Sequence, residues 1–175
     1  MEVVGEYLGL EQDSALFASF RRHDAHFFPA LRTLHRTTFV RQAANLWRLK
    51  ERIWQHVLAQ IPHDPTFAII DSFPLPVCQF APVPRAYRCR GFQGDTAFGK
   101  DTLVRQTFYG WRVHVRLEWP GVIARCCVAP ANANELTALP ALAEQTVGTL
   151  VGDRNYWSPA TTAEWQPHGV ELLAP

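Results

Sequence analysis

The chain has 175 residues, of which 47% are hydrophobic and 19% are charged, and its formal net charge is +1. This hydrophobic fraction excludes an intrinsically disordered protein, and the length suits one folded domain, with or without a small helical extension. No apolar run approaches the length of a membrane span, and the N-terminus lacks the basic-then-apolar pattern of a signal peptide. We therefore expect a globular protein of the cytoplasm.

The four cysteines point to the same compartment. Cys78, Cys89, Cys126 and Cys127 lack the C-x-x-C spacing that is typical of a zinc site. Cys126 and Cys127 are neighbours in a predicted strand, so their side chains face opposite sides. We interpret all four as reduced packing residues, which predicts a reducing compartment.

Residues 1–62 are predicted to be a helical region. A helix begins near Asp13, a short helical pattern covers residues 30–36, and the longest pattern runs over residues 38–61. Two interpretations stay open for this region, namely a helical bundle that covers a sheet and a small helix-turn-helix-like segment that binds DNA. No recognition-helix signature decides between them.

The stretch from Thr66 to Pro76 organises the rest of the chain. Its continuous apolar run predicts a strand that is buried on both faces and ends in the carboxylate of Asp71. Pro74 and Pro76 are expected to stop the strand soon afterwards. Residues 149–153 repeat this arrangement further along, so that a second buried strand ends in Asp153.

A passage rich in proline, arginine and glycine, from Pro74 to Gly99, is predicted to lack regular structure. It carries Arg85, Arg88 and Arg90, interleaved with aromatic residues, a pattern that is compatible with gripping a phosphate backbone. A plain surface loop explains this composition equally well. Between residues 77 and 119 basic residues outnumber acidic ones, which suits a polyanionic substrate held beside an acidic centre.

Residues 110–119 alternate between polar and apolar side chains, which predicts an antiparallel strand with Arg112 and His114 on its polar face. Both residues are candidate DNA contacts, although a lone histidine in a strand is more often structural. Pro120 and Gly121 turn the chain, and residues 122–129 return as the partner strand.

Helices and strands alternate in the remaining sequence. Asn134 can cap a helix over residues 135–146, and we interpret Glu135 as a residue of the helix start. Ser158 caps a second helix with Pro159 in its first turn, and residues 170–175 form a last strand.

The predicted order is that of an α/β fold with an RNase H-like mixed sheet, in which three antiparallel strands are followed by parallel strands added through helices. An N-terminal helical region precedes this sheet. The first and fourth strands are neighbours in such a topology, so Asp71 and Asp153 are expected to meet. Their oxygens suit Mg²⁺ or Mn²⁺, and two such ions serve phosphodiester hydrolysis or transfer.

Four segments resemble the motifs of a DDE-type transposase of a bacterial insertion sequence. They are IDSFPLPVC around Asp71, QTFYGWRVHVRLEWPGVI, APANANEL and GDRNYWSP around Asp153. The resemblance spans about residues 66–175. The turn residues Pro62-His63-Asp64-Pro65 mark the boundary between residues 1–62, a helical region that is a candidate for DNA binding, and residues 63–175, an RNase H-like catalytic domain.

The resemblance implies that Asp71 and Asp153 are the first two catalytic carboxylates and the ligands of a site for two Mg²⁺ or Mn²⁺ ions. The implied activity cuts the ends of a DNA element and joins the exposed 3′-hydroxyl to target DNA. Double-stranded DNA is the implied partner, and a homodimer is compatible with this activity. Arg154, next to Asp153, joins the arginines of the loop and the pair Arg112 and His114 as a DNA-binding candidate.

One departure from the family concerns its third acidic residue, a glutamate on the helix after the fifth strand. The sequence stops at Pro175, directly after that strand, and neither Glu164 nor Glu171 matches the position. We therefore expect a truncated domain without its last catalytic helix, with weakened metal binding, impaired strand transfer and one uncovered sheet face. Two alternatives are a non-catalytic DNA-binding remnant, which would bind through the N-terminal helices and the arginine-rich loop, and an RNase H-like nuclease of another kind.

Overall fold

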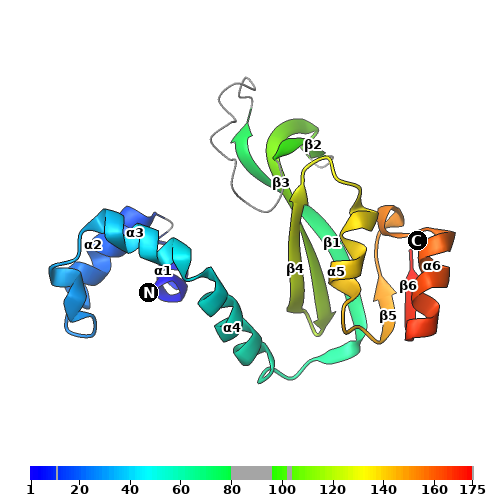
Figure 1. Ribbon diagram of the computed structural model, residues 1–175, viewed down its shortest axis with the longest axis horizontal. Helices are drawn as coiled ribbons and strands as arrows, with labels where there is room; N and C mark the ends of the chain where they lie inside the picture. The colour runs from blue at the N-terminus through cyan, green and yellow to red at the C-terminus, as the bar shows by residue number, and fades with distance from the viewer. Residues whose placement is uncertain (11, 80–95, 102–103, 175) are drawn as a thin grey trace. The chain divides into compact units, whose positions relative to one another are not determined.

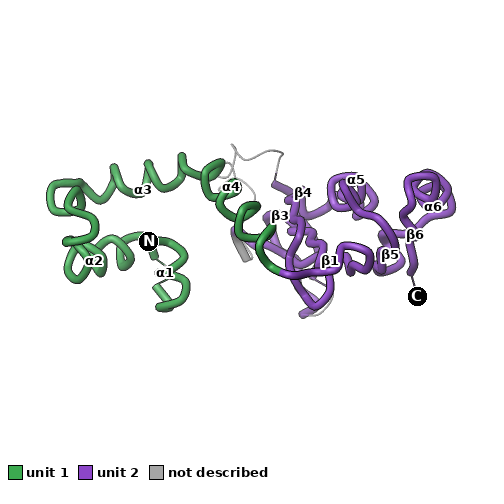
Figure 2. The backbone as a smooth tube through the Cα atoms, turned by 90° about the horizontal axis from the view of Figure 1, so that it is seen from below, with its two compact units in different colours: residues 1–61 green, residues 62–175 purple. Residues whose placement is uncertain are grey.

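The computed structural model describes residues 1–10, 12–79, 96–101 and 104–174 (Figure 1). The chain folds as two compact units, Met1–Ile61 and Pro62–Pro175, which are drawn in different colours in Figure 2. The predicted DNA contacts Arg85, Arg88 and Arg90 lie outside the described residues. In the described ranges no helix is long and apolar enough to cross a membrane.

The first unit is helical, as predicted. Its elements are α1 (Glu2–Tyr7), α2 (Asp13–His23), the 3₁₀ helix η1 (Pro29–Arg32), α3 (Arg36–Asn45) and α4 (Trp47–Leu58). Its core consists of buried side chains from α2, η1 and α3, namely Leu16, Phe17, Phe20, Leu31 and Phe39. The rings of Phe17 and Phe39 lie 5.4 Å apart and join α2 to α3.

The single helix predicted over residues 38–61 is two helices that meet at Leu46. The amide of Leu46 bonds to the carbonyl of Ala43, three residues back, which is the tight bond of a helix end. Helical spacing of apolar residues runs through both helices, so the sequence pattern does not reveal this one-residue interruption.

The second unit is built on a mixed six-stranded sheet in the described part of the chain. Its strands are β1 (Asp64–Gln79), β2 (Ala97–Asp101), β3 (Gln106–Trp119), β4 (Val122–Pro130), β5 (Gly148–Val151) and β6 (Val170–Leu173). β1 pairs antiparallel with β3, and the other edge of β3 pairs with β2 and then with β4. β5 and β6 follow on the far side of β1 as parallel strands. The predicted mixed α/β sheet is confirmed, and its order is compatible with an RNase H-like domain.

β1 is longer than predicted, because Pro74 and Pro76 do not end it. They lie opposite Arg112 and Gly110 of β3, and the pairing continues to Gln79. Two prolines that are two positions apart direct their nitrogens to the same edge of a strand. That edge faces away from β3, and β5 has already ended there, so the missing N–H groups break no ladder bond.

The strand β2 was not predicted, because the sequence Ala-Phe-Gly-Lys-Asp has a glycine at its centre. Gly99 is required by close packing, since a Cβ atom at this position would lie 2.7 Å from the carbonyl oxygen of Ala131. Any larger residue would push the β2 backbone away from the loop that follows β4.

The helix predicted over residues 135–146 is a short 3₁₀ helix, η3 (Glu135–Thr137), followed by α5 (Leu139–Ala143). Pro140 explains the break, because a residue without an N–H fits only in the first turn of a helix. The helix predicted after Ser158 is confirmed as α6 (Pro159–Trp165), and the Ser158 hydroxyl accepts a hydrogen bond from the amide of Thr161 at 3.0 Å.

One face of the sheet carries the core of this unit. α5 lies over this face (Figure 1), and Leu139 and Leu142 pack with Ala68, Ile70 and Leu150. The other face of β1 is exposed, with its apolar side chains between 38% and 48% accessible: Phe67, Ile69, Phe73, Leu75 and Val77. The prediction that this strand is buried on both faces is therefore wrong, because the described helices of this unit cover one face only.

The polar face of β3 is the buried one. Glu118 and Arg116 lie opposite Ala68 and Ile70, so they share the face that α5 covers. Their charges are paired, with 2.8 Å between Arg116 Nη2 and Glu118 Oε1. Arg116 Nη1 also donates to the carbonyl of Leu142 at 2.6 Å, which ties β3 to α5.

Replacement of Arg116 by Met should lower the free energy of unfolding by about 3–5 kcal/mol, because the buried carboxylate of Glu118 loses its arginine partner and keeps only the contact of its other oxygen with His63. Urea denaturation followed by circular dichroism measures this loss. Arg125→Met is the control, since the ion pair of Arg125 with Glu144 is partly exposed and spans 3.6 Å. Its loss should cost about 0–1 kcal/mol, and equal losses in the two variants would contradict the structural role of Arg116.

Candidate functional site

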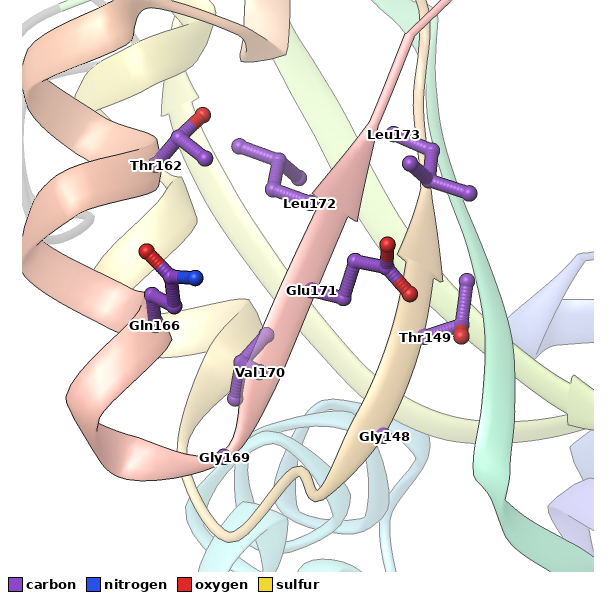
Figure 3. A pocket seen from close by; sticks show the side chains of 9 residues that line it. All are labelled: Gly148, Thr149, Thr162, Gln166, Gly169, Val170, Glu171, Leu172 and Leu173. Carbon is purple, nitrogen blue, oxygen red and sulfur yellow. The ribbon is translucent and has the colours of Figure 1, made fainter.

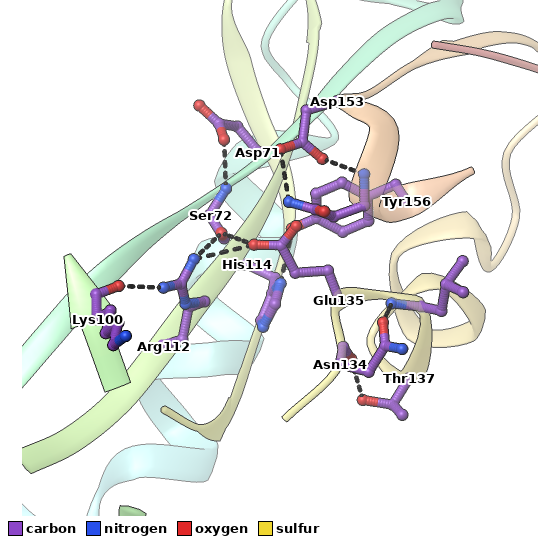
Figure 4. Close-up of polar contacts among 12 residues, drawn as sticks. Asp71, Ser72, Lys100, Arg112, His114, Asn134, Glu135, Thr137, Asp153 and Tyr156 are labelled. Carbon is purple, nitrogen blue, oxygen red and sulfur yellow. Dashed lines mark hydrogen bonds and ion pairs between the residues drawn. The ribbon is translucent and has the colours of Figure 1, made fainter. Parts of the chain in front are cut away.

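Asp71 and Asp153 lie at the fork where β5 leaves β1. Ile69 of β1 is paired with Val151 of β5. Asp71 comes two positions after Ile69, and Asp153 comes two positions after Val151. β5 ends at Val151, while β1 continues, so the edge of β1 beside Asp71 is open. Both aspartates are exposed, and Figure 4 shows them at the same end of the cluster of polar residues.

The backbone on either side holds each carboxylate in place. Asp71 Oδ1 accepts a hydrogen bond of 2.7 Å from the amide of Ser72, which points toward the open edge of β1. Asp153 caps the 3₁₀ helix η4 (Arg154–Tyr156), and its two oxygens accept from the amide and the side chain of Asn155 at 2.8 and 3.1 Å. Charge-assisted bonds of this kind restrict the orientation of a carboxylate.

Gly152 allows the chain to reach Asp153 from β5. A Cβ atom at this position would lie 2.8 Å from Cγ1 of Ile70, a buried side chain of β1. A larger residue would therefore push the turn that carries Asp153 away from the strand that carries Asp71. Close packing at the fork thus requires a glycine directly before Asp153.

A second polar cluster lies on the covered face of the sheet, directly behind Asp71 (Figure 4). The hydroxyl of Ser72 donates to Glu135 Oε1 at 2.8 Å, and Arg112 Nη1 lies 2.9 Å from the same oxygen. Arg112 also donates to the Ser72 hydroxyl at 3.2 Å and to the Lys100 carbonyl at 3.0 Å. The cluster joins β1, β2 and β3 to η3.

Glu135 and Ser72 are members of this cluster that the sequence interpretation did not name as site residues. Glu135 begins η3, as expected of a helix-start residue, but it is only 8% exposed and its side chain points to Ser72 and Arg112. The sequence did contain a signal for this contact of Glu135. Side chains alternate between the two faces of a strand, and this alternation puts Ser72 and Arg112 on one face of the sheet. An arginine on the covered face of a sheet needs an acidic partner, and Glu135 is the first carboxylate after β4.

Tyr156 and His114 form the adjoining contact under Asp153. Both are fully buried, and 2.7 Å separates His114 Nδ1 from the hydroxyl oxygen of Tyr156. Burial, with a smaller contribution from the charges of Glu135, Asp71 and Asp153, raises the pKa of the Tyr156 hydroxyl. Tyr156 is therefore protonated at neutral pH.

The described DNA-binding candidates differ in accessibility. His114 is fully buried, so it does not reach solvent in this structure. The guanidinium of Arg112 is held by Glu135, Ser72 and the Lys100 carbonyl. Arg154 is exposed on η4, directly after Asp153, and is the described arginine that is best placed beside the two aspartates.

The donor set suits a hard divalent cation. Asp71 and Asp153 offer exposed carboxylate oxygens, and Mg²⁺ is commonly held by one or two carboxylates together with waters and substrate phosphate oxygens. Among the described residues, no three side chains of His, Cys, Asp or Glu are grouped so that they could hold a metal ion. Glu135 lies on the other face of β1. It is therefore not a third carboxylate of the site formed by Asp71 and Asp153.

A hollow of about 470 Å³ lies elsewhere, along β5, β6 and α6 (Figure 3). Glu171 lines it opposite Thr149, and Thr162 and Gln166 line it from α6. Thr149 precedes Asp153 by four positions, which is about 13 Å along an extended chain. This hollow is thus distinct from the fork that holds the two aspartates.

Stability should fall at acid pH because of His114. Burial, opposed in part by the charge of Glu135, holds the pKa of folded His114 below its ordinary value of 6.5. Below about pH 6.5 the unfolded chain therefore binds a proton that the folded chain does not, and stability is lost as the pH falls further.

His114→Gln keeps a partner for Tyr156 and removes this titration. Urea unfolding between pH 7.5 and 5.5 should show a smaller loss of stability in the variant than in the original protein. The difference for one proton is at most about 1.4 kcal/mol per pH unit. Other groups, including Glu135 and Arg112 beside the ring, are present in both proteins, so identical slopes would contradict the role of His114.

Comparison with known proteins identifies the family. The family model described as "Transposase DDE domain" matches residues 63–175, which is more than half of the chain and includes both aspartates. Searches of curated proteins and of solved structures found no match. The chain therefore belongs to the family of DDE-type transposases.

Proposed function

We propose that this domain cleaves and joins DNA strands with Asp71 and Asp153 as the ligands of Mg²⁺ or Mn²⁺. The observation that carries the proposal is the register of β5 on β1, which brings two exposed carboxylates to one fork of the sheet. The family match supports the reaction class, because DDE transposases generally use divalent metal ions and act on DNA.

Each group at the fork has a distinct task in this proposal. A divalent ion, when bound, supplies charge stabilisation for the attacking and leaving oxygens of a phosphodiester. Asp71 and Asp153 would hold that ion, and the amide of Ser72 and the side chain of Asn155 restrict the orientations of the two carboxylates. Arg154 attracts the DNA backbone to the same place, since its exposed guanidinium suits a phosphate group.

A second candidate function is DNA binding without catalysis. It is favoured by one observation, namely that only two carboxylates are placed at the fork and no third metal-ligating side chain is grouped with them in the described ranges. The two proposals differ in whether the bound DNA is cut in the presence of Mn²⁺. Both predict binding of double-stranded DNA.

Asp71→Asn and Asp153→Asn should each reduce Mn²⁺-dependent DNA nicking about a hundredfold or more. A metal ion supplies several kcal/mol of transition-state stabilisation, and each 1.36 kcal/mol is tenfold in rate. The measurement is the conversion of supercoiled plasmid to the nicked form.

Asp64→Asn is the matched control, since Asp64 is an exposed aspartate at the other end of β1 that accepts a hydrogen bond from Thr66. Its nicking rate should equal that of the original protein. Equal nicking by all variants would contradict catalysis at the fork, and absence of nicking in every protein, with DNA still bound, would favour the second function.

DNA binding should weaken with salt, because arginine–phosphate contacts release counterions. Arg154→Gln should weaken binding about equally for different DNA sequences and reduce the slope of log affinity against log salt by about one. Fluorescence anisotropy with labelled duplexes between 50 and 200 mM KCl measures both quantities. An unchanged slope in the variant would remove Arg154 from the DNA contact.

A further inference from the structure

We propose that Glu135 is a positioning residue that fixes the carboxylate of Asp71 from the opposite face of the sheet, through Ser72. The proposal rests on the proposed function, in which Asp71 holds a divalent cation, and it assigns a role to a carboxylate that does not itself contact that cation.

Ser72 is the link between the two faces of β1. Its amide donates to Asp71 Oδ1 at 2.7 Å, and its hydroxyl donates to Glu135 Oε1 at 2.8 Å. Successive side chains of a strand point to opposite faces, so Asp71 lies on the exposed face and the Ser72 hydroxyl on the covered one. A rotation of β1 about its axis at this point would break the bond from the Ser72 hydroxyl to Glu135, and it would turn Asp71 together with the Ser72 amide that holds it.

Glu135 is itself held firmly enough to act as an anchor. Arg112 binds the same oxygen, Oε1, at 2.9 Å, and the side chain of Asn134 caps η3 by accepting from the amide of Leu136 at 3.0 Å. Arg112 is in turn bound to the carbonyl of Lys100 in β2. The anchor therefore connects Asp71 to three strands and to η3.

A purely structural role does not account for this charged contact. Apolar residues of similar volume replace a buried ion pair without loss of stability in many proteins. In addition, Glu135 Oε2 is buried and has no hydrogen-bond partner among the described residues, which makes the carboxylate unfavourable as a simple packing group. What the carboxylate provides is an acceptor of fixed direction for the Ser72 hydroxyl.

The test compares Mn²⁺ affinity, measured from the electron paramagnetic resonance signal of free Mn²⁺, with the kinetics of plasmid nicking. Ser72→Ala and Glu135→Met, which has no acceptor oxygen, should each weaken Mn²⁺ binding about tenfold, the lower end of the effect of residues that orient a metal ligand. The double variant should be no weaker than either single variant, because both changes break one chain of hydrogen bonds. Ser72→Thr keeps the hydroxyl and should restore the affinity to within about twofold of the original.

Two controls separate positioning from damage to the fold. Ser72→Ala leaves the ion pair of Glu135 with Arg112 intact, so it weakens Mn²⁺ binding without removing a buried charge. Thr137→Ala removes a bond from the Thr137 hydroxyl to the carbonyl of Asn134 within η3, and its Mn²⁺ affinity should be unchanged. In nicking, the positioning variants should lower kcat with little change in the KM for DNA.

The outcomes distinguish this inference from the function on which it rests. Full Mn²⁺ affinity in Ser72→Ala and Glu135→Met, together with lost affinity in Asp71→Asn, would overturn the role of Glu135 and leave the proposed function standing. Additive losses in the double variant, or failure of Ser72→Thr to restore binding, would also overturn it. Unchanged affinity in Asp71→Asn would overturn the proposed function itself.

Discussion

Parallel pairing between β1 and β5 is the interaction on which the rest of the site depends. Three residues of β1, Phe67 to Ile69, lie opposite Thr149 to Val151, and this short ladder fixes how far the two strands slide along each other. A slip of one position would put the side chains of β5 on the wrong faces and move Asp153 away from Asp71. The close fit of Gly152 against Ile70 sets the same register from the other side.

The order of the strands other than β2 and the approach of the two aspartates were predictable from the sequence, because apolar runs, turns and helix caps are local signals. The continuation of β1 through Pro74 and Pro76 was not, since it depends on which edge of the strand is free. That edge is free because β5, some seventy residues later in the sequence, ends at Val151. Helix lengths were overestimated where one residue, Leu46 or Pro140, interrupts a continuing pattern.

Alternation along β3 was also predictable, but not which of its faces is covered. Polar residues normally mark the solvent side of a strand, and here Arg116 and His114 are buried because Glu118 and Tyr156 satisfy them. Tyr156 belongs to η4, and the Leu142 carbonyl that Arg116 also reaches belongs to α5, so a pattern within one strand cannot reveal these contacts. Glu135 escaped notice for the same reason, since its place as the first residue of η3 explains its position in the sequence and hides its contact with Arg112.

The exposed face of β1 has a consequence for the electrostatics of the fork. Ile69 and Phe73 flank Asp71 on this face, and both are about half accessible to solvent. A molecule that covers these apolar side chains, DNA included, also displaces water from the carboxylate between them and lowers the local dielectric constant. At a lower dielectric constant, the free energy of the ionised Asp71 carboxylate is unfavourable without a counter-ion, and its attraction to a counter-ion is stronger. If Asp71 binds a cation as proposed, covering of the face and uptake of that cation are thermodynamically linked, so that each event strengthens the other.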